Sequence, residues 1–118
     1  MRHVLEVERR KLSCRDEYIV ANGIESDTIA LCLDQGEIVG WARTEVWKGL
    51  PTLEAFVARP YRRRGVATLC SAALVASGTY DNVEVIAVFS PLLLPIARSL
   101  HLPHRLYDLK PDGTWRPA

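Results

Sequence analysis

The pattern of apolar and polar positions predicts short strands along the first half of the chain. Runs rich in β-branched and aromatic residues, which strands favour, cover residues 4–8, 28–33, 38–47 and 52–57. Turn-forming segments at 34–37 and 48–51 separate the last three runs. Because short turns join neighbouring antiparallel strands, we expect three consecutive antiparallel strands here. Residues 12–22 show a weak helical pattern that ends at Asn22-Gly23.

The spacing of apolar residues changes to a helical period after residue 65. Small and apolar residues predict a helix over 66–77, with Gly78 at its end. Residues 83–89 are apolar at nearly every position, which is typical of a parallel or central strand buried on both faces. A short helix over 92–100 and a strand over 105–109 complete the pattern. This order predicts an α+β (α/β mixed) fold: a mixed, mostly antiparallel central sheet flanked by helices on both faces, with one crossover unit.

Length, charge and cysteine content narrow the class of protein. The 118 residues suit one domain, which we place over 1–118. Fifteen basic and 14 acidic residues give a net charge of +1, which argues against a dedicated nucleic-acid binder. The three cysteines lack metal-ligand spacing, so we expect no metal site and reduced thiols. The charged start is unlike a signal peptide and the apolar runs are too short to cross a bilayer, so we expect a cytoplasmic protein without a membrane partner.

A basic loop between a predicted strand and a predicted helix carries the most informative chemistry. Arg62, Arg63 and Arg64 precede Gly65, which opens the helix. The first turn of a helix leaves N–H groups unpaired at the positive end of the helix dipole, and this arrangement binds phosphate. Guanidinium groups add charge and fit phosphate oxygens. The loop lacks the Walker and GxGxxG motifs, and the alternative is a surface run of arginines before an ordinary helix.

The same segment resembles a known family. The run Arg62-Arg63-Arg64-Gly65-Val66-Ala67 matches the R/Q-x-x-G-x-G/A motif of the Gcn5-related N-acetyltransferases, or GNATs. Pro60-Tyr61 is similar to the Pro and the aromatic residue of their loop, with the Pro one place late. Residues 87–102 resemble a second pattern of the family, A-S-x-x-G-x-P-L-Y-x-x-L-G-F. The resemblance covers residues 28–109 and implies the acyl-CoA N-acyltransferase (GNAT) fold.

The resemblance implies that acetyl-CoA is the co-substrate. In GNATs, the backbone of a splayed strand binds the pantetheine arm, and the matching residues here are Ala55, Phe56 and Val57. The loop and the helix start hold the pyrophosphate in that family, and the matching residues here are Arg62, Arg63, Arg64, Gly65, Val66, Ala67 and Thr68. The acceptor amine then attacks the thioester directly in a ternary complex.

The residues that would move protons match the family less well. The usual Tyr, which protonates the leaving thiolate, corresponds to Ala97, and an Asn often found after the fifth strand corresponds to Ser90. Glu54 and Glu84 are the candidate bases, and Glu54 lies close to the expected acyl position. Each has a plainer alternative: an outward-facing strand carboxylate for Glu54 and an edge charge for Glu84. Because alanine cannot donate a proton, water is an alternative acid to Ser90.

Together these features predict transfer of an acetyl group from acetyl-CoA to a primary amine. Only residues 12–26 remain for the helices that shape the acceptor site in GNATs. We therefore expect an open cleft, which suits a protein or peptide amine better than a small-molecule amine, or a cleft completed by a partner subunit in a homodimer. One alternative, motivated by Ala97, is a catalytically weak or inactive module of the same fold that binds another protein. A further alternative is nucleic-acid binding through residues 62–64.

Overall fold

The computed structural model describes residues 3–8 and 28–118, and its elements follow the predicted order of strands and helices. The strands are β1 (His3–Glu8), β2 (Thr28–Asp34), β3 (Glu37–Thr44), β4 (Val46–Trp47), β5 (Leu50–Val57), β6 (Ile86–Val88), β7 (His104–Leu109) and β8 (Trp115–Pro117). The α-helices are α2 (Val66–Ala76) and α3 (Leu94–Ser99), and the 3₁₀ helices are η1 (Arg59–Tyr61) and η2 (Pro91–Leu93). The helix predicted over residues 12–22 lies outside the described residues.

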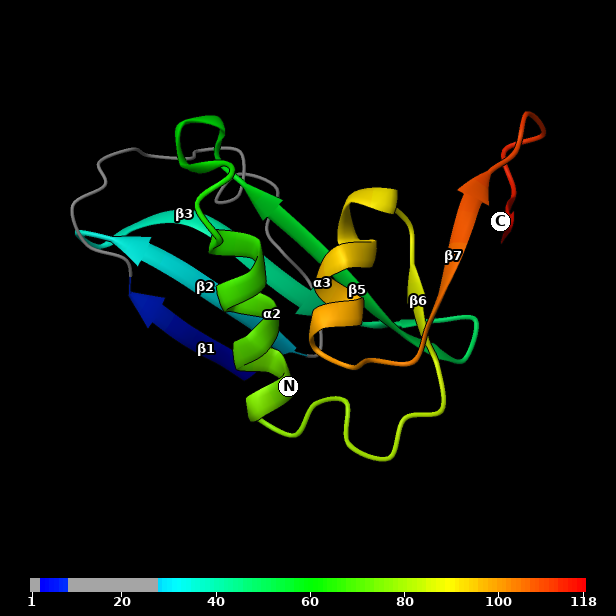
Figure 1. The fold of residues 1–118 in the computed structure, drawn as a ribbon, viewed down its shortest axis with the longest axis horizontal. Helices are drawn as coiled ribbons and strands as arrows, with labels where there is room; N and C mark the ends of the chain where they lie inside the picture. The colour runs from blue at the N-terminus through cyan, green and yellow to red at the C-terminus, as the bar shows by residue number, and fades with distance from the viewer. Residues whose placement is uncertain (1–2, 9–27) are drawn as a thin grey trace.

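The strands form one mixed sheet in the order β1-β2-β3-β5-β6-β7-β8, with β4 also paired to β5 (Figure 1). As predicted, β2, β3 and β5 are consecutive antiparallel neighbours. β6 runs parallel to both β5 and β7. Between β5 and β7 the chain therefore makes two parallel crossovers, one through α2 and one through α3, where the sequence predicted one. β1 is also parallel to its neighbour β2. The fold is α+β with a mixed sheet.

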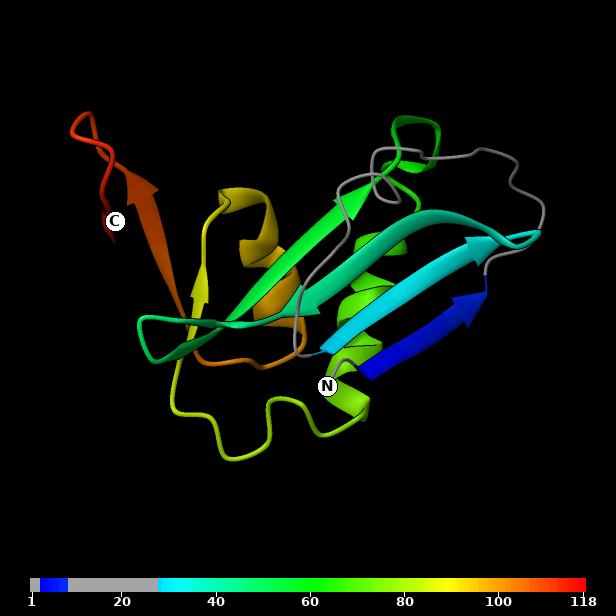
Figure 2. The ribbon, with the colours of Figure 1, turned by 180° about the vertical axis from the view of Figure 1, so that it is seen from behind.

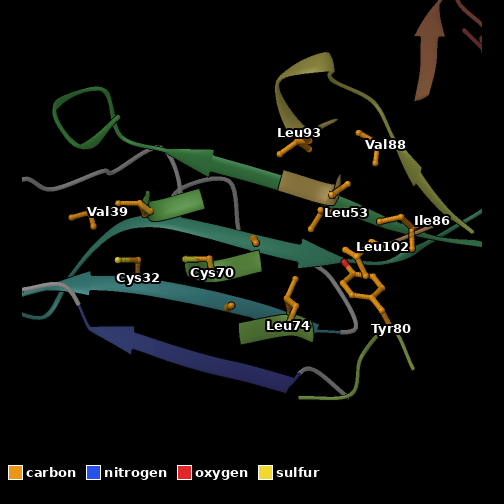
Figure 3. Packing of buried hydrophobic residues seen from close by; sticks show 14 of the residues in the cluster. Cys32, Val39, Leu53, Cys70, Leu74, Tyr80, Ile86, Val88, Leu93 and Leu102 are labelled. Carbon is orange, nitrogen blue, oxygen red and sulfur yellow. The ribbon is translucent and has the colours of Figure 1, made fainter. Parts of the chain in front are cut away.

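Both described helices cover the same face of the sheet (Figures 1 and 2). One core joins α2 and α3 to the strands, and Leu53, Cys70 and Val88 are among its buried side chains (Figure 3). Parallel crossovers are almost always right-handed, and β5, β6 and β7 follow one another in one direction across the sheet. Two such crossovers place their helices on one side. The two described helices therefore cover one face, and whether the predicted helix over residues 12–22 covers the other lies outside the described residues.

β6 is shorter than the strand predicted over 83–89. Its three residues are fully buried, which confirms a central strand covered on both faces. Before it, the N–H of Val83 donates to the carbonyl of Tyr80 in a turn, so Glu84 lies outside the strand. After it, Pro91 begins η2 and has no N–H with which to extend a ladder. An apolar run alone does not show where such turns interrupt it.

α2 closely matches its predicted bounds. It begins after Gly65 and its last turn is closed by bonds from the N–H of Ser77, followed by Gly78 at a φ of +84°. Glycine tolerates this left-handed conformation, which explains the end of the helix at that point. No helix in the described part of the chain combines the length and the apolar character that crossing a membrane requires.

Candidate functional site

The central strands β5 and β6 separate after two residue pairs. Thr52 pairs with Ala87 and Leu53 with Val88, after which β6 ends and β5 continues to Val57. Figure 1 shows the two strands diverging toward their C-terminal ends. On its other edge, β5 stays paired with β3 as far as Val57. Within the described structure, residues 54–57 of β5 therefore have no strand partner on the edge that faces β6.

A pocket of about 710 Å³ lies beside this half of β5. Its walls are residues 55–57, the loop and first turn of α2, and the η2–α3 segment. Nine of the ten residues predicted to bind the cofactor line it, and Arg64 is the exception. The structure therefore gathers the predicted residues around one hollow, although they come from a strand, a loop and a helix.

The start of α2 leaves backbone N–H groups beside the pocket. The helical hydrogen bonds begin with Leu69 N, which donates to Gly65 O at 2.9 Å. The N–H groups of Val66, Ala67 and Thr68 precede that bond, at the positive end of the helix dipole, and all three residues line the pocket. Gly65, as the N-cap residue, has no side chain that could bond these groups. They are therefore left for a ligand or water.

Gly65 is required by its backbone conformation and not by crowding. Its φ is +78°, and a Cβ at this position would meet no atom within 4 Å. The left-handed region costs a residue with a Cβ about 1–2 kcal/mol. The neighbouring Arg63 also has a positive φ, +61°. The loop thus holds two left-handed residues next to the helix start.

The three arginines of the loop occupy different environments. Arg62 Nε donates to the carbonyl of Val57 at 2.9 Å, and its guanidinium lies 5.9 Å from the centre of the Phe56 ring. These contacts tie the loop to the end of β5. Arg63 is exposed and lines the pocket, whereas Arg64 is exposed outside the lining. Arg62 and Arg63 are therefore the guanidinium groups placed to meet an anion in the pocket.

Glu54 stands where β5 and β6 begin to diverge. Leu53 points into the core under the helices, so its neighbour Glu54 faces the other side of the sheet. Glu54 Oε2 accepts a hydrogen bond from Arg43 Nη2 at 3.1 Å, across the β3–β5 register. Glu45 lies 3.9 Å from the same guanidinium. Glu54 is an outward-facing carboxylate, as one of its two interpretations predicted; it is held by Arg43, and neither side chain lines the pocket.

The other two candidate catalytic residues are placed differently. Ser90 caps η2, because its Oγ accepts a hydrogen bond from Leu92 N at 3.3 Å. It follows the end of β6, across the gap from β5. Glu84 is exposed in the segment before β6 and does not line the pocket. The expectation that Glu84 stands on the central strand is wrong, because a turn at residues 80–83 delays the start of that strand.

Ala97 and the end of β6 are both enclosed. Ala97, the position that matches the Tyr of the family, is fully buried in the core. Phe89, directly after β6, packs edge-on against Trp47 with the ring centres 5.0 Å apart, and Tyr107 does the same on Trp47. Trp115 contacts Phe89 at 5.1 Å. These four rings form an aromatic cluster that holds the chain where β6 leaves β5.

Sequence reasoning missed one wall of the pocket and one support beneath it. Leu92, Leu93 and Ile96 line the side opposite β5. Leu92 is 85% exposed, and an exposed leucine in a Pro-containing apolar run gives no signal of its role. The sequence places Asp34 in a turn, yet this residue is buried and accepts a hydrogen bond from Tyr61. A carboxylate beside a Gln-Gly turn is normally exposed to solvent, so nothing in the sequence indicated this contact.

The described residues contain no cluster of three or more His, Cys, Asp or Glu side chains that could hold a metal ion. Comparisons with protein-family models, with curated proteins and with solved structures found no match to this chain. The site is therefore defined by its own geometry: a gap between two strands, a left-handed glycine at a helix start, and two arginines at the mouth.

Proposed function

We propose that this chain is an acetyl-CoA-dependent N-acetyltransferase of the GNAT type, which transfers an acetyl group to a primary amine. The observation that carries the proposal is the place of the pocket. It runs along the unpaired edge of β5 and reaches the start of α2. An elongated ligand with a diphosphate next to a long arm fits such a site better than a compact one.

The residues around the pocket suit acetyl-CoA. The N–H groups of Val66, Ala67 and Thr68 and the guanidinium groups of Arg62 and Arg63 would hold the diphosphate. Apart from the Val57 carbonyl, which already accepts a hydrogen bond from Arg62, the edge of β5 at residues 55–57 offers backbone groups to the amides of the pantetheine arm, as a sheet edge does to an added strand. The apolar wall at residues 92–96 would cover that arm.

The chain's own residues supply the remaining steps. Bound acetyl-CoA would provide a thioester carbonyl as the acyl donor. Glu54 is the candidate acceptor of the ammonium proton, and Arg43, at 3.1 Å, orients its carboxylate. Ser90, across the gap, has a hydroxyl that can donate a hydrogen bond. Since Ala97 cannot act as an acid, water protonates the leaving thiolate, which a thiol pKa of about 8.5 makes feasible.

The acceptor that we propose is a protein or peptide amine in the cytoplasm. A second candidate function is a non-catalytic module that binds another protein, and the buried Ala97 favours it. The two functions differ in turnover and not in fold. Binding of acetyl-CoA and release of thiol therefore have to be measured separately.

Calorimetric titration with CoA tests the binding step. We expect Arg63→Ala to raise the dissociation constant for CoA about tenfold, because it removes one charge from the pocket wall. Arg59→Ala is the matched control: Arg59 is exposed in η1 and does not line the pocket, so it should leave the affinity unchanged. Absence of binding to the unmodified protein would overturn the proposal.

Thiol release from acetyl-CoA, measured with a panel of peptide and small-molecule amines, tests the catalytic step. Release that depends on the amine supports the acetyltransferase. Binding of CoA without release for any amine would instead favour the non-catalytic module. Losses of affinity that are equal for Arg59→Ala and Arg63→Ala would indicate a general charge effect and not a pocket contact.

A further inference from the structure

The loop that carries the arginines has one buried side chain of appreciable size. Arg59, Pro60 and residues 62–65 are exposed, whereas Tyr61 is fully buried beneath them. Tyr61 also lines the pocket. A loop with so little buried surface has few interactions to fix its conformation. Besides the contacts of Arg62 with the end of β5, the buried side chain of Tyr61 is therefore what fixes the loop.

The hydroxyl of Tyr61 donates to Asp34 Oδ2 at 2.8 Å. Asp34 is the last residue of β2, and it is 1% exposed. Its second oxygen, Oδ1, has no hydrogen-bond partner among the described residues. Tyr61 thus supplies the hydrogen bond that the structure gives to this buried carboxylate. Loss of a hydrogen bond to a buried polar atom is costly, because the atom is left without a partner.

The loop needs such an anchor because its backbone is strained. Arg63 and Gly65, on either side of one residue, both have positive φ values, +61° and +78°. A non-glycine residue in this region persists only where its surroundings fix it. The local backbone bonds, from Tyr61 N to Ala58 O at 2.9 Å and from Arg62 N to Arg59 O at 3.2 Å, close the turn before Arg63 and do not include it.

We infer that Asp34 is a positioning residue for the anion-binding loop, and that it acts through Tyr61. The hydrogen bond fixes the loop in the conformation that brings Arg62, Arg63 and the N–H groups of α2 to the pocket before a ligand arrives. Loss of the bond would leave the fold intact but let the loop sample other conformations. Affinity for a diphosphate ligand then falls, because binding must first order the loop. The inference rests on the proposed function only for the identity of that ligand.

A second buried tyrosine provides a matched control. Tyr80 donates to the carbonyl of Thr52, also at 2.8 Å, and is likewise buried, but it lies outside the pocket lining. Tyr61→Phe and Tyr80→Phe each remove one buried hydroxyl that donates a hydrogen bond of 2.8 Å, and Tyr80→Phe also removes the hydrogen bond with Thr44. Both variants should lose stability, which urea denaturation measures. Only Tyr61→Phe should alter the loop.

Two measurements separate positioning from a merely structural role. We expect Tyr61→Phe to raise the calorimetric dissociation constant for CoA about tenfold. It should also speed hydrogen exchange of the backbone amides at residues 62–68 by a similar factor, while the core amides stay protected. Tyr80→Phe should change neither. Asp34→Asn, which keeps an oxygen as acceptor, should retain most of the affinity that Asp34→Ala loses. The double variant Asp34→Ala with Tyr61→Phe should be no worse than either single variant.

Several results would overturn the inference. Equal effects of Tyr61→Phe and Tyr80→Phe would show a general loss of stability. Additive losses in the double variant would show that the two residues act separately, and an Asp34→Asn variant as weak as Asp34→Ala would assign the effect to charge. If the unmodified protein does not bind CoA, the proposed function fails. The exchange rates of the loop amides then decide the inference without that ligand.

Discussion

The two halves of β5 share one strand but differ in their surroundings. At the first half, Thr52 and Leu53 pair with β6 and are fully buried. At the second half, residues 54–57 pair with β3 on one edge and are only half-buried. The first half carries the sheet across the molecule. The second half ends that continuity and presents a strand edge to the pocket.

Each half also has its own buried tyrosine. Tyr80 bonds the carbonyl of Thr52 at the paired half, and Tyr61 bonds Asp34 below the loop that borders the open half. The same interaction thus stabilises strand pairing in one place and loop geometry in the other. The difference teaches that the site forms where β6 ends and the second half of β5 continues without a partner on that edge. It follows that the paired half should govern stability and the open half should govern binding.

The largest effect is expected for Leu53→Ala, in the paired half. Leu53 is fully buried in the core between the sheet and the helices, so the change leaves a cavity and should lower the free energy of unfolding by about 3 kcal/mol. Urea denaturation measures this loss. A loss below about 1 kcal/mol would contradict the expectation that the paired half of β5 governs stability.

Gly40→Ala should disturb the open half next most strongly. Gly40 pairs with Val57, and a Cβ there would lie 2.6 Å from Val66 Cγ1 and 3.1 Å from the carbonyl of Phe56. Both neighbours belong to the pocket lining, and the carbonyl cannot move freely. We expect a loss of about 2 kcal/mol together with weaker CoA binding.

Gly49→Ala is a useful comparison for that variant. Gly49 lies in the β4–β5 turn, where a Cβ meets no atom within 4 Å but φ is +77°. It should cost stability through backbone strain, about 1 kcal/mol, without changing CoA affinity. If Gly40→Ala lowered stability and left the affinity unchanged, the start of α2 would not depend on its packing against β3.

Tyr80 should make the paired half sensitive to alkaline pH. Burial is the main cause that raises the pKa of Tyr80 above its ordinary value of 10.0; the charge of Glu54 adds to the rise and a hydrogen bond with Thr44 opposes it. Because the folded pKa is raised, this stability is complete below the unfolded pKa and is lost as the pH rises beyond it. We expect the free energy of unfolding to fall by up to about 1.4 kcal/mol per pH unit above pH 10.

The measurement is the difference between the unmodified protein and Tyr80→Phe. The variant should be less stable at pH 7, since it lacks the bond to Thr52, but its stability should fall less steeply above pH 10. If the free energy of unfolding of the two proteins changed in parallel with pH, ionisation of the Tyr80 hydroxyl would not destabilise the paired half of β5.

Much of this division could be expected from the sequence, for identifiable reasons. The β-branched runs and short turns predicted β2, β3 and β5, and helix-forming residues between two glycines predicted α2. The position of Gly65 after three arginines located one wall of the pocket, since a glycine directly before a helix is typical of a left-handed backbone that a ligand can approach closely. These signals are local, and local chemistry determines them.

What the sequence did not reveal depends on contacts between distant segments. The start of β6 depends on a turn at residues 80–83, and its end on Phe89 packing against Trp47, far away in the chain. The contact between Asp34 and Tyr61 joins residues 27 positions apart. The ion pair that holds Glu54 depends on the register between β3 and β5. Periodicity reports none of these pairings, because each requires knowledge of which strands are neighbours.

The smallest effect on stability, and the sharpest test of the boundary between the halves, is expected for Glu54→Gln. Its ion pair with Arg43 is partly exposed, with side-chain exposures of 28% and 22%, so solvent screens it and its loss should cost about 0.5 kcal/mol. If Glu54 accepts the ammonium proton, kcat should nevertheless fall about 100-fold. CoA affinity should stay unchanged, because Glu54 does not line the pocket.

Glu45→Gln is the matched control, since Glu45 lies 3.9 Å from the same guanidinium and its backbone bonds to Thr52 in the paired half of β5. It removes a longer and more exposed contact of the same arginine and should leave kcat within about twofold of the unmodified value. Equal losses of turnover in the two variants would mean that Arg43, and not the carboxylate of Glu54, is what the reaction needs. A loss confined to Glu54→Gln would place the proton transfer at the residue where the sheet stops and the pocket begins.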